Sequence, residues 1–358
     1  MRAAVLHETG QEKLEVHDGV EIPATGPGRV RVRMRAASLC HSDLSAMSGV
    51  LPQPAPFVPG HEGAGEITEV GEGVQGLAVG DHVVVCWMPP CGRCPSCRRG
   101  KGNLCLAGFA NMGTPNYRFD GTDIFGFSGT GTFAEESVVA AGCAVKIPDD
   151  VPFAIGALIG CGVTTGVGAA INTAKVEPGS SVVVIGCGGV GIAAIQGARV
   201  AGAAQIVAVD PVAARREWAL GFGATESVAP EGLAEAVQRL TGGEGFDYAV
   251  EVVGKSATVR SAYDATRRGG ALVVVGAGAM DDMAQFNMFE LFFNEKRILP
   301  SLYGGSDVLS TYQTMINLWR AGRLDLAGMI THHVGLENIN EAIEQMRTGE
   351  ALRTVIDL

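Results

Sequence analysis

The most regular pattern in the chain is an alternation of basic and apolar residues between positions 29 and 36. Arginine stands at every odd position of this stretch, and Val, Val, Met and Ala stand at the even ones. Successive side chains of a β-strand point to opposite faces, so a period of two predicts a half-buried strand. We therefore interpret the arginines as a solvated strand face and not as a nucleic-acid-binding stripe.

The rest of the pattern divides the chain into two kinds of structure. The first 150 residues combine short apolar runs with frequent Gly and Pro, and with turn pairs such as Glu72-Gly73 and Asp120-Gly121, which predicts a mainly antiparallel, barrel-like lobe. From residue 181 onward, strand-like and helix-like segments alternate, which predicts a parallel, doubly wound sheet. The predicted strands are 181–185, 205–209, 246–253 and 271–275, and the predicted helices are 189–201, 233–240 and 256–267.

The C-terminal segment carries two amphipathic helical stretches, 309–318 and 336–346, and then a strand-like end at 352–358. We expect it to return to the first lobe. The predicted division is residues 1–162 and 302–358 for one domain, with a small lobe at 91–105, and residues 163–301 for the other. The predicted fold class is α/β.

Composition narrows the possible partners. The chain of 358 residues is 47% hydrophobic and 18% charged, with a formal charge of -11, so it can bury a large core and repels phosphate backbones and anionic lipid. Glu8 and Glu12 interrupt the N-terminal segment where a secretory signal needs an apolar run. Residues 178–198 have the length of a membrane span but contain six glycines, which favours a buried strand, turn and helix. We expect a cytoplasmic protein with no nucleic-acid or membrane partner.

Cysteine spacing indicates a metal site. Cys91, Cys94, Cys97 and Cys105 follow the pattern C-x2-C-x2-C-x7-C. Four thiolates in a short loop suit a tetrahedral zinc ion, and such a site leaves no place for substrate, so its role is structural. A pair of disulfides or unliganded thiols is the alternative. The other cysteines, Cys86, Cys143 and Cys187, lack ligand spacing and are interpreted as packing residues.

A second candidate metal site is dispersed along the chain. Its possible ligands are Cys40, His61 and Cys161. Each residue alone is weak evidence for a metal site, because a cysteine after a strand is more often a small buried hydrophobic residue than a ligand. Their polar neighbours Ser42, Asp43 and Glu62 could orient the ligands. Two cysteines and one histidine would leave a fourth zinc position open, which is the catalytic pattern.

A glycine motif predicts a dinucleotide site. The predicted strand 181–185 leads into Gly186-Cys-Gly-Gly-Val-Gly191, a helix follows, and the next strand ends at Asp210. Gly186 permits the tight turn, Gly188 the approach of a pyrophosphate and Gly191 close helix packing. Asp210 stands 19 residues after Gly191, where a carboxylate binds the ribose of NAD and repels the phosphate of NADP. Arg215 and Arg216 nearby keep NADP open as the alternative.

The segments GHEGAGE, the four-cysteine lobe, GCGVTTG and GCGGVG occur in the order and spacing of the zinc-containing medium-chain alcohol dehydrogenases. The chain resembles that family over essentially its whole length. The resemblance implies a GroES-like catalytic domain and a Rossmann NAD-binding domain, two zinc ions per chain and NAD. It implies that Cys40, His61 and Cys161 bind the catalytic zinc, that Asp43 and Glu62 support it, and that Ser42 accepts the alcohol proton.

The resemblance also implies cofactor contacts. These positions are His41, Thr165, Gly186, Gly188, Gly189, Val190, Gly191, Asp210, Arg215, Val253, Val275, Gly276, Ala277 and Arg353. Many members carry a histidine three residues after the proton-accepting hydroxyl, and here that position is Ser45. We expect the proton to leave through the cofactor ribose and water, or through His41.

By the same resemblance, Leu51, Trp87 and the 109–127 loop line an apolar substrate pocket, which favours aryl, allylic or aliphatic primary alcohols over polyols. The alternative for Trp87 is core packing.

Two alternative functions stay open. One is a glutathione-dependent formaldehyde dehydrogenase, for which Arg118 is the only evident anion-binding residue. The other is a non-catalytic zinc- and NAD-binding relative or sensor. Residues 297–302 resemble the segment through which members pair, so we expect a homo-oligomer, with a dimer favoured and a tetramer possible.

Overall fold

The computed structural model describes residues 1–358 and divides into two compact units. The first unit comprises Met1–Cys161, Asp307–Asn317 and Leu326–Leu358, and the second comprises Gly162–Ser306 and Leu318–Asp325. The short return Leu318–Asp325 packs in the second unit because the Gln196 side chain hydrogen-bonds both to the Asp325 backbone N–H, at 2.8 Å, and to its carbonyl, at 3.3 Å.

The first unit is built around a seven-stranded sheet of order β10-β6-β5-β3-β18-β17, with β9 also paired to β3. All its pairs are antiparallel except β17 with β18, which confirms the mainly antiparallel lobe. The small sheets β1-β2 and β4-β8-β7 complete the unit. The strands are β1 (Ala3–Val5), β2 (Glu15–His17), β3 (Arg29–Ser38), β4 (Phe57–Val58), β5 (Gly63–Val70), β6 (His82–Val85), β7 (Tyr117–Phe119), β8 (Thr122–Gly126), β9 (Glu136–Ala140), β10 (Ala144–Lys146), β17 (Ile330–Gly335) and β18 (Arg353–Asp357).

Strand β3 confirms the prediction made from the arginine alternation. Val30, Val32 and Met34 are buried in one core, while the arginines lie on the other face. Three of the arginines form ion pairs with glutamates of neighbouring strands, and Arg29 donates to the Val138 carbonyl at 2.5 Å. The arginine face of β3 is thus neutralised by ion pairs across neighbouring strands, and such pairs stabilise a sheet.

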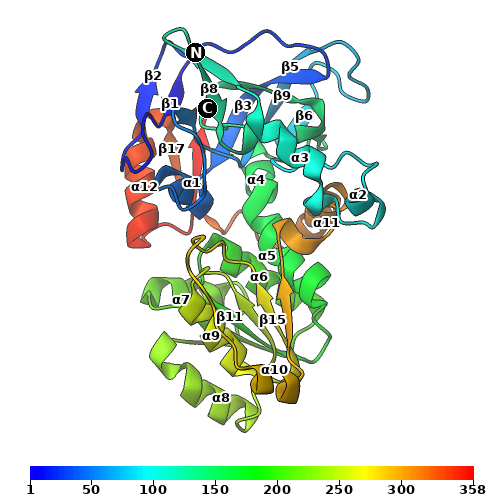
Figure 1. Cartoon of the computed structure of the whole chain (residues 1–358), viewed down its shortest axis with the longest axis vertical. Helices are drawn as coiled ribbons and strands as arrows, with labels where there is room; N and C mark the ends of the chain where they lie inside the picture. Colours follow the sequence, from blue (N-terminus) through cyan, green and yellow to red (C-terminus); the bar gives the residue numbers. More distant parts are fainter. The chain divides into compact units, whose positions relative to one another are not determined.

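The C-terminal segment belongs to the first unit, and Figure 1 shows helix α12 and strand β17 beside the N-terminal strands. Asn340 in α12 hydrogen-bonds to both the N–H and the carbonyl of Leu14, and Leu14 shares a core with Ile339 and Ile343. The helices of this unit are α1 (His41–Met47), α2 (Pro95–Arg98), α3 (Leu106–Ala110), α4 (Phe153–Leu158), most of α11 (Val308–Arg320) and α12 (Ile339–Thr348).

The second unit confirms the predicted parallel sheet. Its strand order is β13-β12-β11-β14-β15-β16, and all five pairs are parallel. The order reverses between β11 and β14, which is where such sheets bind their ligands. The strands are β11 (Ser181–Ile185), β12 (Gln205–Val209), β13 (Glu226–Val228), β14 (Phe246–Glu251), β15 (Thr266–Val274) and β16 (Arg297–Pro300); the helices are α5 (Thr164–Gly168), α6 (Gly189–Ala201), α7 (Ala213–Gly221), α8 (Leu233–Thr241), α9 (Ser256–Ala265) and α10 (Met288–Asn294).

One expectation about a helix boundary needs correction, and the expectation for residues 178–198 is confirmed. The helix predicted at 256–267 ends at Ala265, because Thr266 pairs with Phe246 of β14 and begins β15. Residues 178–198 do form a strand, a turn and a helix, but a different segment, Phe153–Ala174, is the helix whose length and apolar composition could cross a membrane. Most of its apolar window, 83%, is buried inside the protein, as in a core helix.

Candidate functional site

Cys40, His61 and Cys161 come together in the first unit. One ligand atom from each of these residues, and one from Glu62, lie within 4.8 Å of one another, and all four residues are buried. Cys40 follows β3 in extended backbone and is the N-cap residue of helix α1, and His61 precedes β5. Cys161 lies in a π-helical turn, η5 (Ile159–Val163), a local widening that is frequent at functional sites.

Glycine and tyrosine fix the backbone around these ligands. Gly60 has a φ of +91°, and a Cβ there would lie 2.5 Å from the Thr132 hydroxyl, so only glycine lets the chain turn directly before His61. The Tyr312 hydroxyl donates to the Gly160 carbonyl at 2.7 Å, which supports the π-helical turn. The ligand positions are therefore set by the fold and not by flexible loops.

Asp43 orients the imidazole. The Asp43 Oδ1 atom lies 2.9 Å from His61 Nδ1, and its other oxygen accepts from the Cys40 N–H at 2.9 Å. Burial raises the pKa of Asp43, against the pull of His61. With Nδ1 engaged, the buried His61 Nε2 atom has no hydrogen-bond partner. A buried polar atom of this kind is costly unless something binds it.

The charges of the site favour a cation. The hydrogen bond with Cys161 lowers the pKa of the Cys40 thiol well below its usual value, aided by the charges of His61 and Arg353. Burial alone would lower the pKa of His61, but the charges of Asp43 and Cys40 raise it well above its usual value. Two sulfurs, one unpartnered imidazole nitrogen and nearby carboxylates are the donor set that zinc prefers.

Arg353 and Glu62 form a buried ion pair beside these ligands. The Arg353 guanidinium contacts the Glu62 carboxylate and donates to the Ser38 hydroxyl at 2.7 Å. Burial raises the pKa of Glu62 to about 8, although Arg353 opposes the shift. The sequence suggested Arg353 only as a cofactor contact, and its pairing with Glu62 has no signal in the local sequence, since the residues are 291 positions apart. The cofactor contact of Arg353 stays a prediction.

The other predicted residues of this unit lie as follows. The Ser42 hydroxyl is 3.8 Å from the Cys40 sulfur, and His41 is exposed at the first position of α1. The rings of Trp87 and Phe127 meet the His61 ring edge-on, with centroids 6.4 and 5.2 Å away. Leu51 packs against the core that contains Phe127. Trp87 and Phe127 thus lie beside the imidazole, with Phe127 the nearer of the two, and their role as walls of a substrate pocket stays a prediction.

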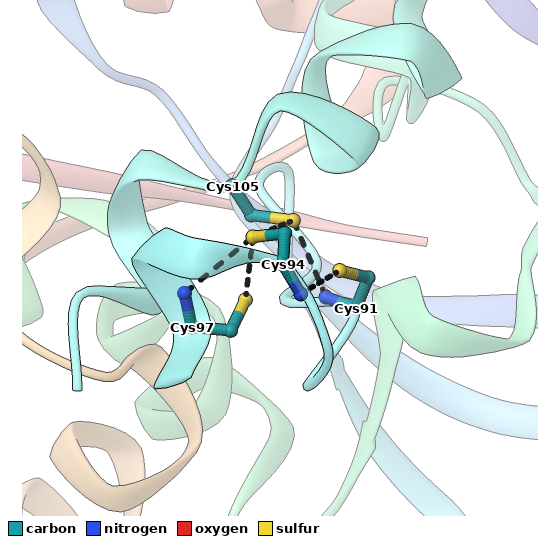
Figure 2. Close-up of side chains that lie close together, drawn as sticks. All are labelled: Cys91, Cys94, Cys97 and Cys105. Carbon is teal, nitrogen blue, oxygen red and sulfur yellow. Dashed lines mark hydrogen bonds between the residues drawn. The ribbon is translucent and has the colours of Figure 1, made fainter. Parts of the chain in front are cut away.

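Figure 2 shows the four cysteines of the 91–105 lobe with their sulfurs turned toward one another. Their ligand atoms lie within 4.8 Å of one another, and none is in a disulfide. The Cys94 sulfur is 3.5 Å from the Cys97 sulfur and 3.9 Å from the Cys105 sulfur. Sulfurs at the corners of a zinc tetrahedron lie about 3.8 Å apart, from Zn–S bonds of about 2.3 Å. The lobe fits a zinc ion, and the disulfide alternative is not what the structure contains.

The pKa values of two cysteines in the lobe are shifted in opposite directions. Hydrogen bonds from the N–H groups of Arg93 and Cys94 lower the pKa of Cys91 to about 6, whereas burial raises the pKa of Cys97 to about 12. The remaining cysteines, Cys86, Cys143 and Cys187, are each fully buried, as expected of packing residues.

The glycine motif of the second unit has the shape of a phosphate cradle. Gly186 has a φ of +95°, and a Cβ on Gly191 would lie 1.8 Å from the Gly186 carbonyl oxygen, so both positions require glycine. A Cβ on Gly188 would meet nothing within 4 Å. The open space beside Gly188 lies at the N-terminus of α6, which favours an anion.

Asp210 follows β12 and is held by the same turn. Its carboxylate accepts from the Cys187 N–H at 2.8 Å and from the Val212 N–H at 2.9 Å. The Arg216 guanidinium donates to the carbonyls of Asp210 and Pro211. Arg215 lies half-buried in α7.

The other predicted cofactor positions of this unit lie at the starts of helices α5 and α6 and in the loops that follow β14 and β15. Gly166, next to Thr165, leaves no room for a Cβ against the Val190 carbonyl, and Gly276 leaves none against Gly254. Val275 and Gly276 donate their N–H groups to the Glu251 carbonyl. Gly189 and Val190 open helix α6, and Ala277 follows Gly276 in the loop after β15.

Sequence reasoning missed Glu251. This buried carboxylate accepts the N–H groups of Val253 and Gly254 and the Thr258 hydroxyl, each at 2.7–2.8 Å. It thereby shapes the loop after β14, where Val253 stands. An acidic residue at the end of an otherwise apolar strand was the available signal.

Comparisons with known proteins agree with this arrangement. Residues 26–149 match the family described as "Alcohol dehydrogenase GroES-like domain", and residues 189–320 match "Zinc-binding dehydrogenase". A "Putative alcohol dehydrogenase D" of Mycobacterium tuberculosis is 39% identical over 99% of this chain and 98% of its own length. An "S-(hydroxymethyl)glutathione dehydrogenase" of Synechocystis is 37% identical over 99% of both chains. The solved benzyl alcohol dehydrogenase of Acinetobacter calcoaceticus superposes with a TM-score of 0.92 and 31% identity, over 100% of this chain and 99% of that one.

Proposed function

The chain belongs to the zinc-containing medium-chain alcohol dehydrogenase family, and we propose that it is an NAD-dependent enzyme that interconverts an apolar primary alcohol and its aldehyde. The observation that carries the proposal is the convergence of Cys40, His61 and Cys161, with a buried imidazole nitrogen that has no protein partner. A closed structural site alone would not explain this cluster, because Arg353 engages the Glu62 carboxylate and the three other ligands leave a fourth place open.

Two zinc ions per chain and NAD are the proposed cofactors. Cys40, His61 and Cys161 would bind the catalytic zinc, and the cysteines of the 91–105 lobe would bind the structural one. When bound, the catalytic zinc supplies Lewis acidity toward an alcohol or carbonyl oxygen, and NAD supplies the hydride acceptor. Asp43 holds His61 in the tautomer that offers Nε2, and Arg353 offsets the charge of Glu62.

The first proton acceptor in this proposal is Ser42, whose hydroxyl lies next to the Cys40 sulfur. Ser45 has no ring that could pass a proton on, so the exit is through the cofactor ribose and water, or through His41. His41→Ala distinguishes the two routes: a shifted pH profile of hydride transfer assigns the exit to His41, and an unchanged profile assigns it to ribose and water.

NAD is favoured over NADP by the position of Asp210. Its buried carboxylate would accept ribose hydroxyls and would repel a 2'-phosphate. Gly188 leaves the room that a pyrophosphate needs. The Arg216 guanidinium is directed to backbone carbonyls, which weakens the argument for NADP.

The substrate class is proposed from the aromatic wall. Trp87 and Phe127 flank His61, and Leu51 adds an aliphatic surface, so an apolar alcohol is better accommodated than a polyol, whose hydroxyls would lack partners. The similarity to a benzyl alcohol dehydrogenase supports an aryl alcohol. A higher kcat/KM for sorbitol than for benzyl alcohol would refute this pocket assignment.

Glutathione-dependent formaldehyde oxidation is the second candidate, because of the similarity to the Synechocystis enzyme. Such a substrate needs cations for its carboxylates, and the Arg118 side chain is paired with Asp123 at 2.9 Å on the surface. Formaldehyde turnover that depends strictly on glutathione would favour this candidate. No NADH from any alcohol, with two zinc ions and NAD bound, would favour a non-catalytic relative.

A homodimer is the proposed assembly, with a tetramer as the alternative, and the cytoplasm is the proposed location. Strand β16 is an edge strand, and α10 exposes Met288, Phe289 and Phe292. Exposed apolar side chains beside an unpaired strand edge suit burial against a second copy. Light scattering during gel filtration measures the assembly directly.

The enzymatic proposal is tested by counting zinc and following NADH in the same preparation. We expect two zinc ions per chain, NADH formation from benzyl alcohol, and loss of turnover in His61→Ala together with one zinc ion. His333→Ala, on the surface, is the matched control. Full turnover in a His61→Ala protein would overturn the proposal.

A further inference from the structure

Three side chains of the N-terminal hairpin converge outside both sites described above. His7, Glu15 and His17 each offer one ligand atom, and these atoms lie within 4.8 Å of one another. The two Nε2 atoms are 2.9 Å apart, and the nearer Glu15 oxygen is 3.7 Å from His7 and 3.5 Å from His17. Neither the catalytic proposal nor the cysteine lobe uses these residues.

The hairpin brings the three residues together. Strands β1 and β2 pair so that Val5 faces Glu15 and Ala3 faces His17, and His7 follows β1 at the point where the chain turns away. The Gln11 side-chain oxygen accepts the N–H groups of His7 and Glu8, which fixes that turn. The cluster is thus set by strand pairing and a local turn, although residues 8–14 separate its members in sequence.

One aromatic ring lies beside both imidazoles of the cluster. The Phe119 ring of β7 lies 4.4 Å from the His17 ring and 6.0 Å from the His7 ring, centroid to centroid. The histidine side chains keep 30% and 24% of their surface exposed, so an ion can reach them from solvent. Side chains that are already restricted lose little conformational entropy when they bind an ion, and their partial exposure lets the ion approach.

The spacing matches metal coordination. Two nitrogens bound to one tetrahedral zinc ion, at about 2.0–2.1 Å each, lie about 3.4 Å apart. The observed separations of 2.9, 3.5 and 3.7 Å bracket that value. The hydrogen bond between the two imidazoles uses one nitrogen as donor and the other as acceptor, and the Glu15 carboxylate takes no part in it. A divalent cation would engage all three groups.

We propose that His7, Glu15 and His17 form a third metal site, which binds a borderline divalent ion such as Zn²⁺ through two imidazoles and one carboxylate, with water completing the coordination. Imidazole and carboxylate ligands suit zinc, and three protein ligands leave room for water. The site is exposed and lacks thiolates, so it binds more weakly than the cysteine lobe. Because its ligands lie on both sides of residues 8–14, bound metal ties the two strands of the hairpin together.

Equilibrium dialysis of the zinc-loaded full chain against free Zn²⁺, followed by metal analysis, tests the proposal. We expect the wild-type protein to bind one more zinc ion per chain than His17→Ala, and Glu15→Gln to bind it more weakly. His333→Ala is the matched control, because His333 also pairs with one carboxylate, that of Asp357 at 3.1 Å, but has no third ligand. It should retain the additional ion.

Thermal unfolding provides a second measurement. Added Zn²⁺ should raise the melting temperature of the wild-type protein and of His333→Ala but not that of His17→Ala, because an ion that binds only the folded chain stabilises it. Alcohol oxidation by His17→Ala should equal that of the wild type, which separates this site from the catalytic one. Equal zinc content in wild type and His17→Ala, or the same loss in His333→Ala, would overturn the proposal.

Discussion

Asp43 and His61 are joined by a buried contact of 2.9 Å between Oδ1 and Nδ1. This contact determines which imidazole nitrogen is left for a ligand, and Nε2 is the one without a partner. Asp43 also accepts the N–H groups of Cys40 and Gly60, so one carboxylate positions two of the three proposed zinc ligands. A carboxylate behind a metal-binding histidine raises its basicity and fixes its orientation.

Replacing this carboxylate should weaken the proposed metal centre. We expect Asp43→Asn to lower zinc affinity or kcat/KM by about 10–100-fold, as for other partners of metal-binding histidines. The amide also replaces one carboxylate oxygen by an N–H donor, so the side chain loses either the bond from the Cys40 N–H or the contacts with the Gly60 N–H and His61. Zinc content and NADH formation, measured against the surface variant Asp264→Asn, provide the test. An Asp43→Asn enzyme with wild-type zinc retention and rate would show that Asp43 does not support a metal ligand.

The two glycines of the phosphate turn should respond differently to alanine. Gly191→Ala places a methyl group against the Gly186 carbonyl and should destabilise the fold by about 1–3 kcal/mol, the usual range for overpacking. Gly188→Ala meets no neighbour, so its urea midpoint should stay near that of the wild type. Its NAD dissociation constant should rise at least about tenfold, or ~1.4 kcal/mol, because the methyl group occupies the phosphate approach. Unchanged NAD binding by Gly188→Ala would place the cofactor elsewhere.

Charge at position 210 should determine the choice of cofactor. Asp210→Asn keeps an acceptor for one of the two N–H groups that the carboxylate binds and removes the charge that repels a 2'-phosphate. The ratio of kcat/KM for NADP to that for NAD should rise at least about tenfold, since a like-charge contact costs several kcal/mol. A ratio is insensitive to partial loss of folded protein. If it does not change, Asp210 does not face the ribose.

Asp247 should make the second unit less stable in acid. Burial tends to raise the pKa of this carboxyl, but hydrogen bonds from Ser181 and Arg267 outweigh burial and lower it. A lowered native pKa adds stability above the ordinary value of about 3.9, and this stability disappears as the pH falls through the native value. The urea midpoint of Asp247→Asn should therefore lie below that of the wild type at neutral pH and approach it in acid. A difference that grows in acid would contradict the assignment.

The sequence predicted the fold wherever periodicity and turn chemistry agreed. Strand β3 follows from its alternation, and β11, α6 and β12 follow from an apolar run, three constrained glycines and a second apolar run. The end of α9 was not predictable locally, because Thr266 leaves the helix to pair with β14, and that pairing is tertiary. The π-helical turn at Cys161 likewise has no local sequence signature.

Only part of the candidate site could be predicted from the sequence. The metal ligands and their polar neighbours could be predicted, because only a few residue types bind zinc or orient its ligands. Contacts between distant positions could not be named. Arg353 with Glu62 and Phe127 with His61 depend on how separate elements pack. The His7, Glu15 and His17 cluster escaped notice because its members fit no established spacing and meet only after β1 and β2 pair.

Anomalous diffraction at the zinc edge from crystals of the zinc-loaded protein tests the central claim most directly. We predict a peak bonded to Cys40 Sγ, His61 Nε2 and Cys161 Sγ, at about 2.0–2.3 Å from each atom. A peak in the cysteine lobe, with none among these three side chains, would contradict the proposed catalytic metal centre.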